Sequence, residues 1–275
     1  MTIWESIVLG IVEGLTEFLP VSSTGHLTIA EKVLGMPIDD ASITAYTAVI
    51  QIGAIAAVLV YFWSDIARIT VAWFRGLFKP EHRGEIDHRM GWYVIVGSTP
   101  IVIVGFLAKD LISGPLRSLW WVAGALIAWS AVMVLAERVA SQARPLARIT
   151  LTDAVVMGVV QAVALVPGVS RSGATISAGL LRGLDRVAAT RMAFLLGIPA
   201  LVGAGVYELK DALDGGVGMA PTAVGTIVSF VVAYASVAWL MRFVQKHTIE
   251  VFVVYRVALG ILLIALLAAG TMSAT

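Results

Sequence analysis

The sequence predicts an all-α integral membrane protein with six transmembrane helices and two re-entrant helix–turn–helix hairpins in an inverted repeat. Three observations predict this fold: the composition, two apolar stretches that are interrupted in the middle, and an internal duplication. Of the 275 residues, 59% are hydrophobic and 13% are charged, and the mean hydropathy is +0.92. Such values are typical of integral membrane proteins. We expect one polytopic membrane domain over residues 1–275, with one repeat at about 1–140 and the other at about 150–275.

The composition also excludes some classes of site and partner. The chain contains no cysteine, which rules out disulfide bonds and thiolate metal sites. The formal net charge is +1, whereas a nucleic-acid partner calls for a strongly basic face. No nucleic-acid partner is therefore expected.

The N-terminal apolar stretch is broken into two parts. Residues 3–19 are interrupted by three glutamates and end at Pro20, and the next apolar stretch, 26–34, is shorter than the roughly 20 residues that span a bilayer. We expect these two parts to form a hairpin that enters the membrane and returns to the same side. Six later stretches are long enough to span it: 42–63, 92–108, 119–135, 187–207, 222–241 and 251–269.

A second broken stretch, 151–184, lies between the third and the fourth span and is similar to the first. Residues 10–13 (Gly-Ile-Val-Glu) align with residues 158–161 (Gly-Val-Val-Gln), and the same offset pairs Ser22 with Ser170. Internal repeats set the architecture of a chain. The duplicated unit is a hairpin followed by three spans, and an odd number of spans inverts the second unit relative to the first.

The connecting segments carry signals for the membrane interface. Residues 64–90 combine aromatic and basic side chains, which favours an amphipathic helix on the membrane surface. Tyr61, Tyr207 and Tyr255 fall near the ends of predicted spans, where tyrosine commonly serves as an interfacial anchor.

Lysine and arginine are distributed unevenly between the two sides of this topology. Thirteen fall on one side and four on the other, leaving out Arg171 and Arg256 as intramembrane or boundary residues. Since cytoplasmic loops carry the excess of basic residues, both termini and the first hairpin are predicted on the outer side. The four outer residues are Lys32, Lys109, Arg117 and Lys210.

The first hairpin concentrates polar groups within apolar sequence. Glu13 and Glu17 are four residues apart and would share one helix face. Ser22, Ser23 and Thr24 are suited to cap the second helix, whose N-terminus would suit a phosphate group. A histidine three residues after Ser23, His26, could reach a hydroxyl near the turn, although a lone membrane histidine is commonly structural.

The second hairpin places an arginine among small and hydroxyl residues. Arg171 offers a rigid fork for phosphate oxygens, and glycine lets the backbone approach a ligand closely. Together, the two turns indicate a phosphate site with a metal ion. Two structural alternatives remain open, a buried Glu–Arg ion pair that fixes the hairpins and an ordinary Gly/Ser-rich helix break. The polar and flexible positions of this turn are Gly168, Ser170, Arg171, Ser172 and Thr175.

Residues 13–26 and 167–175 resemble the two signature motifs of the undecaprenyl-pyrophosphate phosphatases, the bacitracin-resistance proteins of the bacterial cytoplasmic membrane. The resemblance implies hydrolysis of undecaprenyl pyrophosphate to undecaprenyl phosphate and inorganic phosphate, which recycles the lipid carrier for cell-wall synthesis. It also implies a site that faces the outer side and a divalent cation, Mg²⁺ or Ca²⁺.

These observations predict a role for each site residue. Ser23 attacks the terminal phosphorus with His26 or Glu17 as base, Glu13 and Glu17 hold the metal, and Arg171 clamps the phosphate oxygens. Direct attack by water stays open. The remaining phosphate-binding candidates are Ser22, Thr24, Gly168, Ser170, Ser172 and Thr175.

Two other functional classes are possible. Inverted repeats with broken helices are also the architecture of secondary transporters or flippases, here of an anionic lipid phosphate. A membrane scaffold is the third class, and the charges within its apolar segments count against it. The Ser23 and His26 pair favours the enzyme, because transport does not need it. The expected partners are a polyprenyl pyrophosphate, membrane lipids and a second copy in a homodimer.

Overall fold

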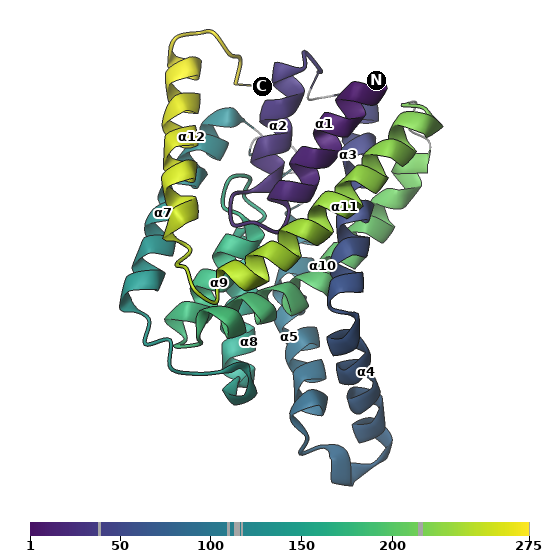
Figure 1. The fold of residues 1–275 in the computed structure, drawn as a ribbon, viewed down its shortest axis with the longest axis vertical. Coiled ribbons are helices and arrows are strands. Elements are labelled where there is room, and N and C mark those ends of the chain that lie inside the picture. Colours follow the sequence, from purple (N-terminus) through teal and green to yellow (C-terminus); the bar gives the residue numbers. More distant parts are fainter. Residues whose placement is uncertain (38–39, 109–110, 113–115, 117, 214–216, 275) are drawn as a thin grey trace.

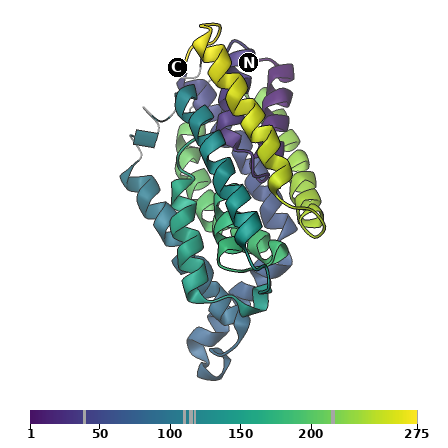
Figure 2. The ribbon, with the colours of Figure 1, turned by 90° about the vertical axis from the view of Figure 1, so that its left-hand side faces the viewer.

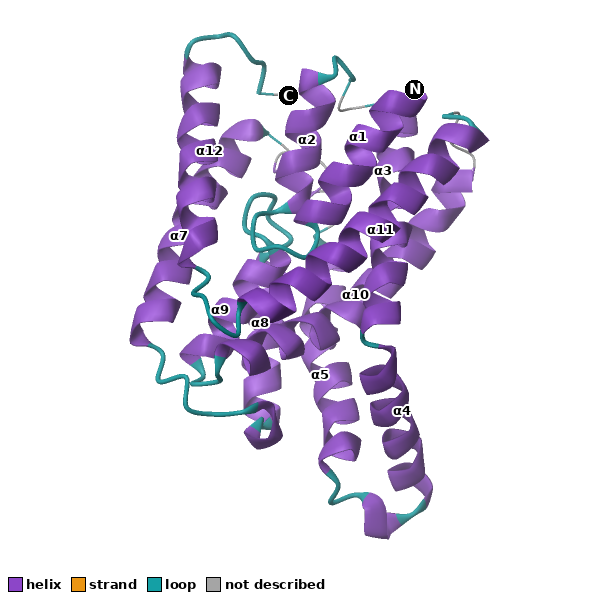
Figure 3. Ribbon diagram, in the orientation of Figure 1, coloured by secondary structure: helices purple, strands orange, loops and turns teal. Residues whose placement is uncertain are grey.

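The computed structural model describes residues 1–37, 40–108, 111–112, 116, 118–213 and 217–274. The described residues form an all-helical protein without β-strands (Figure 3). Lys109 and Arg117 lie outside the described residues, as do the side chains of Tyr207 and Lys210.

Six helices in the described part of the chain are long and apolar enough to cross a membrane, as predicted. Their apolar windows overlap all six predicted stretches. The windows are Ser42–Tyr61, Ile86–Leu107, Leu119–Val139, Arg186–Val206, Met219–Phe243 and Glu250–Ala268. The corresponding helices are α3 (Ala41–Tyr61), α5 (Ile86–Leu107), α7 (Leu119–Val139), α10 (Arg186–Leu213), α11 (Met219–Phe243) and α12 (Glu250–Ala268).

Both broken stretches form a pair of shorter helices joined by a turn. The first pair is α1 (Ile3–Thr16) and α2 (Ser23–Val33), and the second is α8 (Leu151–Val163) and α9 (Arg171–Leu181). The first helix of each pair begins at a capping box, built on Thr2 in α1 and on Thr150 in α8. In both boxes a threonine hydroxyl and an acidic side chain satisfy free N–H groups of the first turn.

The turn in each pair ends at a serine with a positive φ angle. Ser22 has φ of 79° and Ser170 has φ of 75°. A residue with a side chain rarely adopts this conformation and stays there only when its surroundings hold it. The same unusual turn is therefore built twice, directly before α2 and α9.

The hairpins are packed into the bundle through close backbone contacts. Helix α1 lies against α11, and α8 lies against α5. A Cβ atom added to Gly10 of α1 would be 2.6 Å from the carbonyl oxygen of Gly225, and one added to Gly158 of α8 would be 1.9 Å from that of Gly97. Only glycine permits this close approach, so Gly10 and Gly158 let each hairpin pack directly against the backbone of its neighbouring helix.

Around the hairpins, the long helices form the walls of the bundle. Helix α3 packs against α10 and α11, while α7 packs against α12 and α9 (Figure 1). Two 3₁₀ turns, Pro80–His82 and Leu146–Arg148, lie in the loops before α5 and α8. The buried apolar side chains extend from the first hairpin turn through α3, α10 and α11.

An additional helix follows α3 and covers the first part of the segment 64–90, for which an amphipathic helix was predicted, while the end of that segment belongs to α5. Helix α4 (Trp63–Phe78) buries Ile69 and exposes Phe74 and Phe78. It lies along α5, and the two extend beyond the rest of the bundle (Figure 1 and Figure 2). Its position on a membrane surface stays a prediction.

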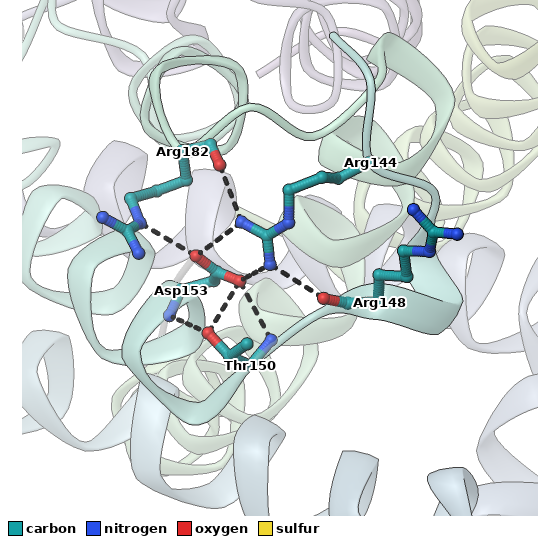
Figure 4. A network of polar contacts seen from close by, with 5 residues as sticks. All are labelled: Arg144, Arg148, Thr150, Asp153 and Arg182. Atoms are coloured by element: carbon teal, nitrogen blue, oxygen red, sulfur yellow. Dashed lines mark hydrogen bonds and ion pairs between the residues drawn. The ribbon is translucent and has the colours of Figure 1, made fainter. Parts of the chain in front are cut away.

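At the end of the molecule where α8 begins, a buried carboxylate joins three segments (Figure 4). Asp153 accepts hydrogen bonds from Arg144 at 2.5 Å, from Arg182 at 2.8 Å and from the hydroxyl of Thr150 at 2.8 Å. Burial alone would raise the pKa of Asp153, but these hydrogen bonds outweigh burial and hold its pKa well below the ordinary value. The carboxylate therefore stays charged and ties the loop before α8 to the end of α9.

Candidate active site

The two hairpin turns meet in the middle of the molecule, where Figure 3 shows them as teal loops. The backbone N–H of Gly168 in the second turn donates a 3.0 Å hydrogen bond to the hydroxyl of Ser22 in the first. Gly168 has φ of 99°, and a Cβ atom there would lie 2.5 Å from the carbonyl oxygen of Val122. A glycine is thus required at this junction.

Arg256 of α12 holds both turns at once. Its guanidinium donates to the carbonyl oxygen of Pro20 at 3.1 Å and to that of Gly168 at 2.9 Å. The residue is 0% exposed, and further bonds from it reach Val169, Ser130 and Leu126. Five backbone and hydroxyl acceptors therefore offset the cost of burying this charge.

Glu17 connects the first hairpin to the second. Its Oε1 accepts a 2.8 Å hydrogen bond from Nη2 of Arg171, and its Oε2 accepts a 2.5 Å hydrogen bond from the hydroxyl of Ser23. The Glu17 side chain is 6% exposed and the Arg171 side chain 17%. One carboxylate thus contacts both the predicted nucleophile and the predicted phosphate clamp. The Glu–Arg ion pair of the structural alternative is therefore present. Glu17 also accepts a hydrogen bond from the Ser23 hydroxyl, which an ion pair that only fixes the hairpins does not need.

The second turn orders its polar groups around Arg171. Ser170 caps α9 by accepting a 3.2 Å hydrogen bond from the N–H of Gly173, and its hydroxyl lies 3.2 Å from that of Ser172. The hydroxyl of the fully buried Thr175 donates to the carbonyl oxygen of Arg171 at 2.8 Å. The side chain of Arg171 also donates to the carbonyl of Gly197 at 3.2 Å, which fixes its direction.

Of the predicted metal ligands, Glu13 lies in the last turn of α1 and Glu17 is the C-cap of that helix, where its backbone N–H donates to the Glu13 carbonyl oxygen at 2.9 Å. Both residues are buried. In the described residues no group of three or more His, Cys, Asp or Glu converges. The carboxylates of Glu13 and Glu17, together with the Ser23 hydroxyl that contacts Glu17, would supply an all-oxygen donor set. Such a set fits Mg²⁺ or Ca²⁺, and Mg²⁺ in particular is commonly held by one or two carboxylates and completed by substrate phosphates.

His26 has both ring nitrogens occupied by groups other than Ser23. Nδ1 lies 2.7 Å from the carbonyl oxygen of Ser22, and Nε2 lies 2.6 Å from the hydroxyl of Tyr255. The Ser23 hydroxyl donates its hydrogen bond to Glu17. Thr24, the remaining candidate of the first turn, is exposed beside Ser23. Among the two bases proposed for Ser23, the geometry favours Glu17.

Sequence reasoning missed two residues of α12. The sequence alone indicates only an interfacial anchor at Tyr255 and an intramembrane or boundary charge at Arg256. Arg256 carried a usable signal, because a charge within an apolar span is expensive and is therefore commonly functional. No sequence signal indicated the role of Tyr255, since its contact with His26 joins residues 229 positions apart.

Comparisons with known proteins place the chain in one family. The model of the bacitracin resistance protein BacA family matches residues 6–262. A protein of Frankia alni named undecaprenyl-diphosphatase 1 is 56% identical over 275 residues, covering 100% of this chain and 99% of the relative. A protein of the same name from Streptomyces coelicolor is 58% identical over 273 residues, with 99% and 98% covered. An undecaprenyl-diphosphatase of Acidothermus cellulolyticus is 55% identical over 270 residues, with 98% of each chain covered. With its two polar turns joined at Glu17 and its whole length matched, the chain belongs to the bacitracin resistance protein BacA family.

Proposed function

We propose that the protein hydrolyses undecaprenyl pyrophosphate to undecaprenyl phosphate and inorganic phosphate. The whole-length identity to relatives named undecaprenyl-diphosphatase supports this activity. The observation that carries it is the Glu17 carboxylate, which contacts the hydroxyl of Ser23 and the guanidinium of Arg171 at once. A nucleophile, a base and a cationic clamp are the groups that phosphoryl transfer needs.

In the first step, Ser23 attacks the terminal phosphorus. Glu17 accepts the Ser23 proton across the 2.5 Å hydrogen bond while the Oγ–P bond forms. The bond between that phosphorus and the bridging oxygen breaks, and undecaprenyl phosphate leaves with the electron pair. Water then attacks the phosphorus of the phosphoserine, the Oγ–P bond breaks, Glu17 returns its proton to the Ser23 oxygen, and inorganic phosphate leaves with the protons of the water. Direct attack by water on the substrate, with Glu17 as its base, is the competing route.

Arg171 binds the oxygens on which negative charge accumulates. Its guanidinium is planar and suited to two phosphate oxygens, and its contact with Gly197 aims it along the site. The hydroxyls of Ser170 and Ser172 and the N–H groups at the starts of α2 and α9 complete the donor set, whereas the buried Thr175 hydroxyl is committed to the Arg171 carbonyl and supports the turn. Because these groups are fixed before the substrate arrives, they need little reorganisation during the reaction.

A divalent cation belongs to this proposal. Glu13 and Glu17, with the Ser23 hydroxyl nearby, are the residues that would hold it. When bound, Mg²⁺ or Ca²⁺ neutralises pyrophosphate oxygens and stabilises the leaving group. The protein residues alone orient the substrate phosphates and move the Ser23 proton.

We further infer an inverted repeat in the membrane, with both hairpins re-entrant. The capping boxes on Thr2 and Thr150 and the strained serines Ser22 and Ser170 support it, because each pair is separated by 148 residues. The contact of α1 with α11 matches that of α8 with α5. The basic residues at the ends of α4 and α8 support a cytoplasmic location for those ends, with the first hairpin, the site and both termini outside. A homodimer remains an expectation of the sequence.

Hydrolysis by the purified protein tests the function. Detergent-purified protein, given undecaprenyl pyrophosphate, should release inorganic phosphate and undecaprenyl phosphate, and EDTA should stop the release. Arg171→Ala should lower the rate by about 10²–10³-fold, the cost of removing one transition-state donor. Arg138→Ala, which removes an exposed arginine paired with Glu250, is the matched control and should keep the wild-type rate. A folded wild-type protein that releases no phosphate with any divalent ion would contradict the proposal and favour transport.

A further inference from the structure

The hydroxyl of Tyr255 contacts a residue of the site, His26, but has no role in the proposed reaction. Tyr255 lies on α12 directly before Arg256 and is 48% exposed. Its hydroxyl is 2.6 Å from Nε2 of His26, and the two rings stack with centroids 5.5 Å apart and planes 18° apart. An interfacial anchor needs neither contact, so the pair requires another explanation.

The surroundings of His26 decide which ring nitrogen carries the proton. A backbone carbonyl only accepts hydrogen bonds, so the 2.7 Å contact of Nδ1 with the Ser22 carbonyl places the proton on Nδ1. In the neutral imidazole the lone pair is then on Nε2, which accepts the hydrogen bond of the Tyr255 hydroxyl. Ser22 is itself fixed, because its own hydroxyl accepts from Gly168. The tautomer is thus determined by groups from α12 and from the first turn.

We propose that Tyr255 is a positioning residue of the phosphatase that holds His26 in the Nδ1–H tautomer with its basic Nε2 atom turned toward α12. The inference rests on the proposed function and deepens it. It leaves Glu17 as the acceptor of the Ser23 proton. It also keeps the Nε2 lone pair of His26 at the half-exposed edge of the site, where a proton of the water or phosphate group reaches it by displacing the Tyr255 hydroxyl.

A spectroscopic test measures the tautomer without turnover. Tyr255→Phe keeps the ring and its stacking and removes only the donor. In protein labelled with ¹⁵N-histidine, the ring signals of His26 are assigned by their loss in His26→Gln. We expect Nε2 of His26 to shift toward its value without a hydrogen bond in Tyr255→Phe. Tyr234→Phe removes one hydroxyl from a comparably exposed tyrosine of α11, and it should leave the spectrum unchanged.

A kinetic test asks whether Tyr255 acts through His26. Loss of one neutral hydrogen bond should lower kcat of Tyr255→Phe by about three- to tenfold with little change in KM. In the His26→Gln background, Tyr255→Phe should cause no further loss. Unchanged His26 signals in Tyr255→Phe, or independent effects of the two substitutions, would overturn the inference. Failure of the wild-type protein to release phosphate would instead overturn the proposed function, since the spectrum does not depend on turnover.

Discussion

The polar groups of the site depend on one carboxylate. Glu17 accepts hydrogen bonds from residues of both hairpins and is almost fully buried. A charge buried in a membrane protein is expensive unless it is paired, so Arg171 and Ser23 stabilise it in the resting state. The same contacts align the proton acceptor with the nucleophile. The hydrogen bonds that stabilise the buried Glu17 are therefore also the contacts that connect the catalytic groups.

Replacing the Glu17 carboxylate should lower the rate of the chemical step. Glu17→Gln keeps the size of the side chain but removes the negative charge that accepts the Ser23 proton. We expect kcat to fall by about 10²-fold or more, the usual contribution of a general base. Steady-state kinetics with purified protein measures the change. Glu250→Gln, which alters a half-buried glutamate paired with Arg138, is the control and should retain the wild-type kcat.

The nucleophile makes a second prediction at this scale. Ser23→Ala removes the hydroxyl and leaves the rest of the first turn in place, since Ser22 rather than Ser23 contacts Gly168. We expect phosphate release to become undetectable while the protein still elutes as the folded wild type does, with its free energy of unfolding lower by about 1.5–3 kcal/mol for the lost hydrogen bond to Glu17. A variant that keeps a rate near that of the wild type would indicate that water attacks the substrate directly.

At the scale of elements, both turns are held by one residue outside the hairpins, and the ends of the second hairpin are joined by a carboxylate of α8. Arg256 of α12 bonds carbonyl oxygens of each turn, and Asp153 joins the start of α8 to the end of α9. The turns themselves include serines in a strained backbone conformation. Their geometry is therefore maintained by side chains that take no part in phosphoryl transfer.

Replacing the guanidinium of Arg256 with a lysine amine should lower the stability of the protein. Arg256→Lys keeps a positive charge but cannot reach all five acceptors. Hydrogen bonds of charged groups contribute about 1.5–3 kcal/mol each, so we expect the free energy of unfolding to fall by about 2–4 kcal/mol. Unfolding in detergent measures this loss. Arg138→Lys alters a 73% exposed arginine and should change the stability little. Equal stability of the two variants would contradict the role given to Arg256.

The Asp153 network predicts how stability depends on pH. Its folded pKa lies below the ordinary value of 3.8, so the network contributes its full stability above that value and loses it as pH falls toward the folded pKa. Asp153→Asn should therefore be less stable than the wild type at pH 7 and at pH 5 by the same amount. The difference should shrink only below about pH 4. A difference that already disappears between pH 7 and pH 5 would show that another group titrates.

At the scale of the whole molecule, the topology has two sides with different charge. The sequence places thirteen basic residues on one side, and the absence of cysteine makes the sides testable. A single cysteine at position 32 should react with a membrane-impermeant maleimide in intact cells. Single cysteines at positions 83 and 246 should react only after permeabilisation. The opposite pattern would invert the orientation and place the site on the cytoplasmic side.

Much of this architecture was predictable, because hydrophobic length alone identifies spans in a chain of this composition. The hairpins were predictable from Pro20 and the Ser-rich turns, and a buried Glu–Arg pair was one of the alternatives that the need to compensate buried charge left open. The contacts of Tyr255 and Arg256 were not, because they join α12 to residues more than 80 positions away. Residue spacing encodes neighbours on one helix, whereas helix-to-helix contacts depend on packing of the whole bundle.

The most direct measurement is the transfer of the terminal phosphate to the protein. Undecaprenyl pyrophosphate labelled in its terminal phosphorus would be mixed with enzyme and quenched during the first turnover. Labelled phosphate is expected on Ser23 of the wild type and absent from Ser23→Ala. Phosphate release at the full rate, with no labelled protein at any quench time, would contradict the assignment of Ser23 as the group that attacks phosphorus.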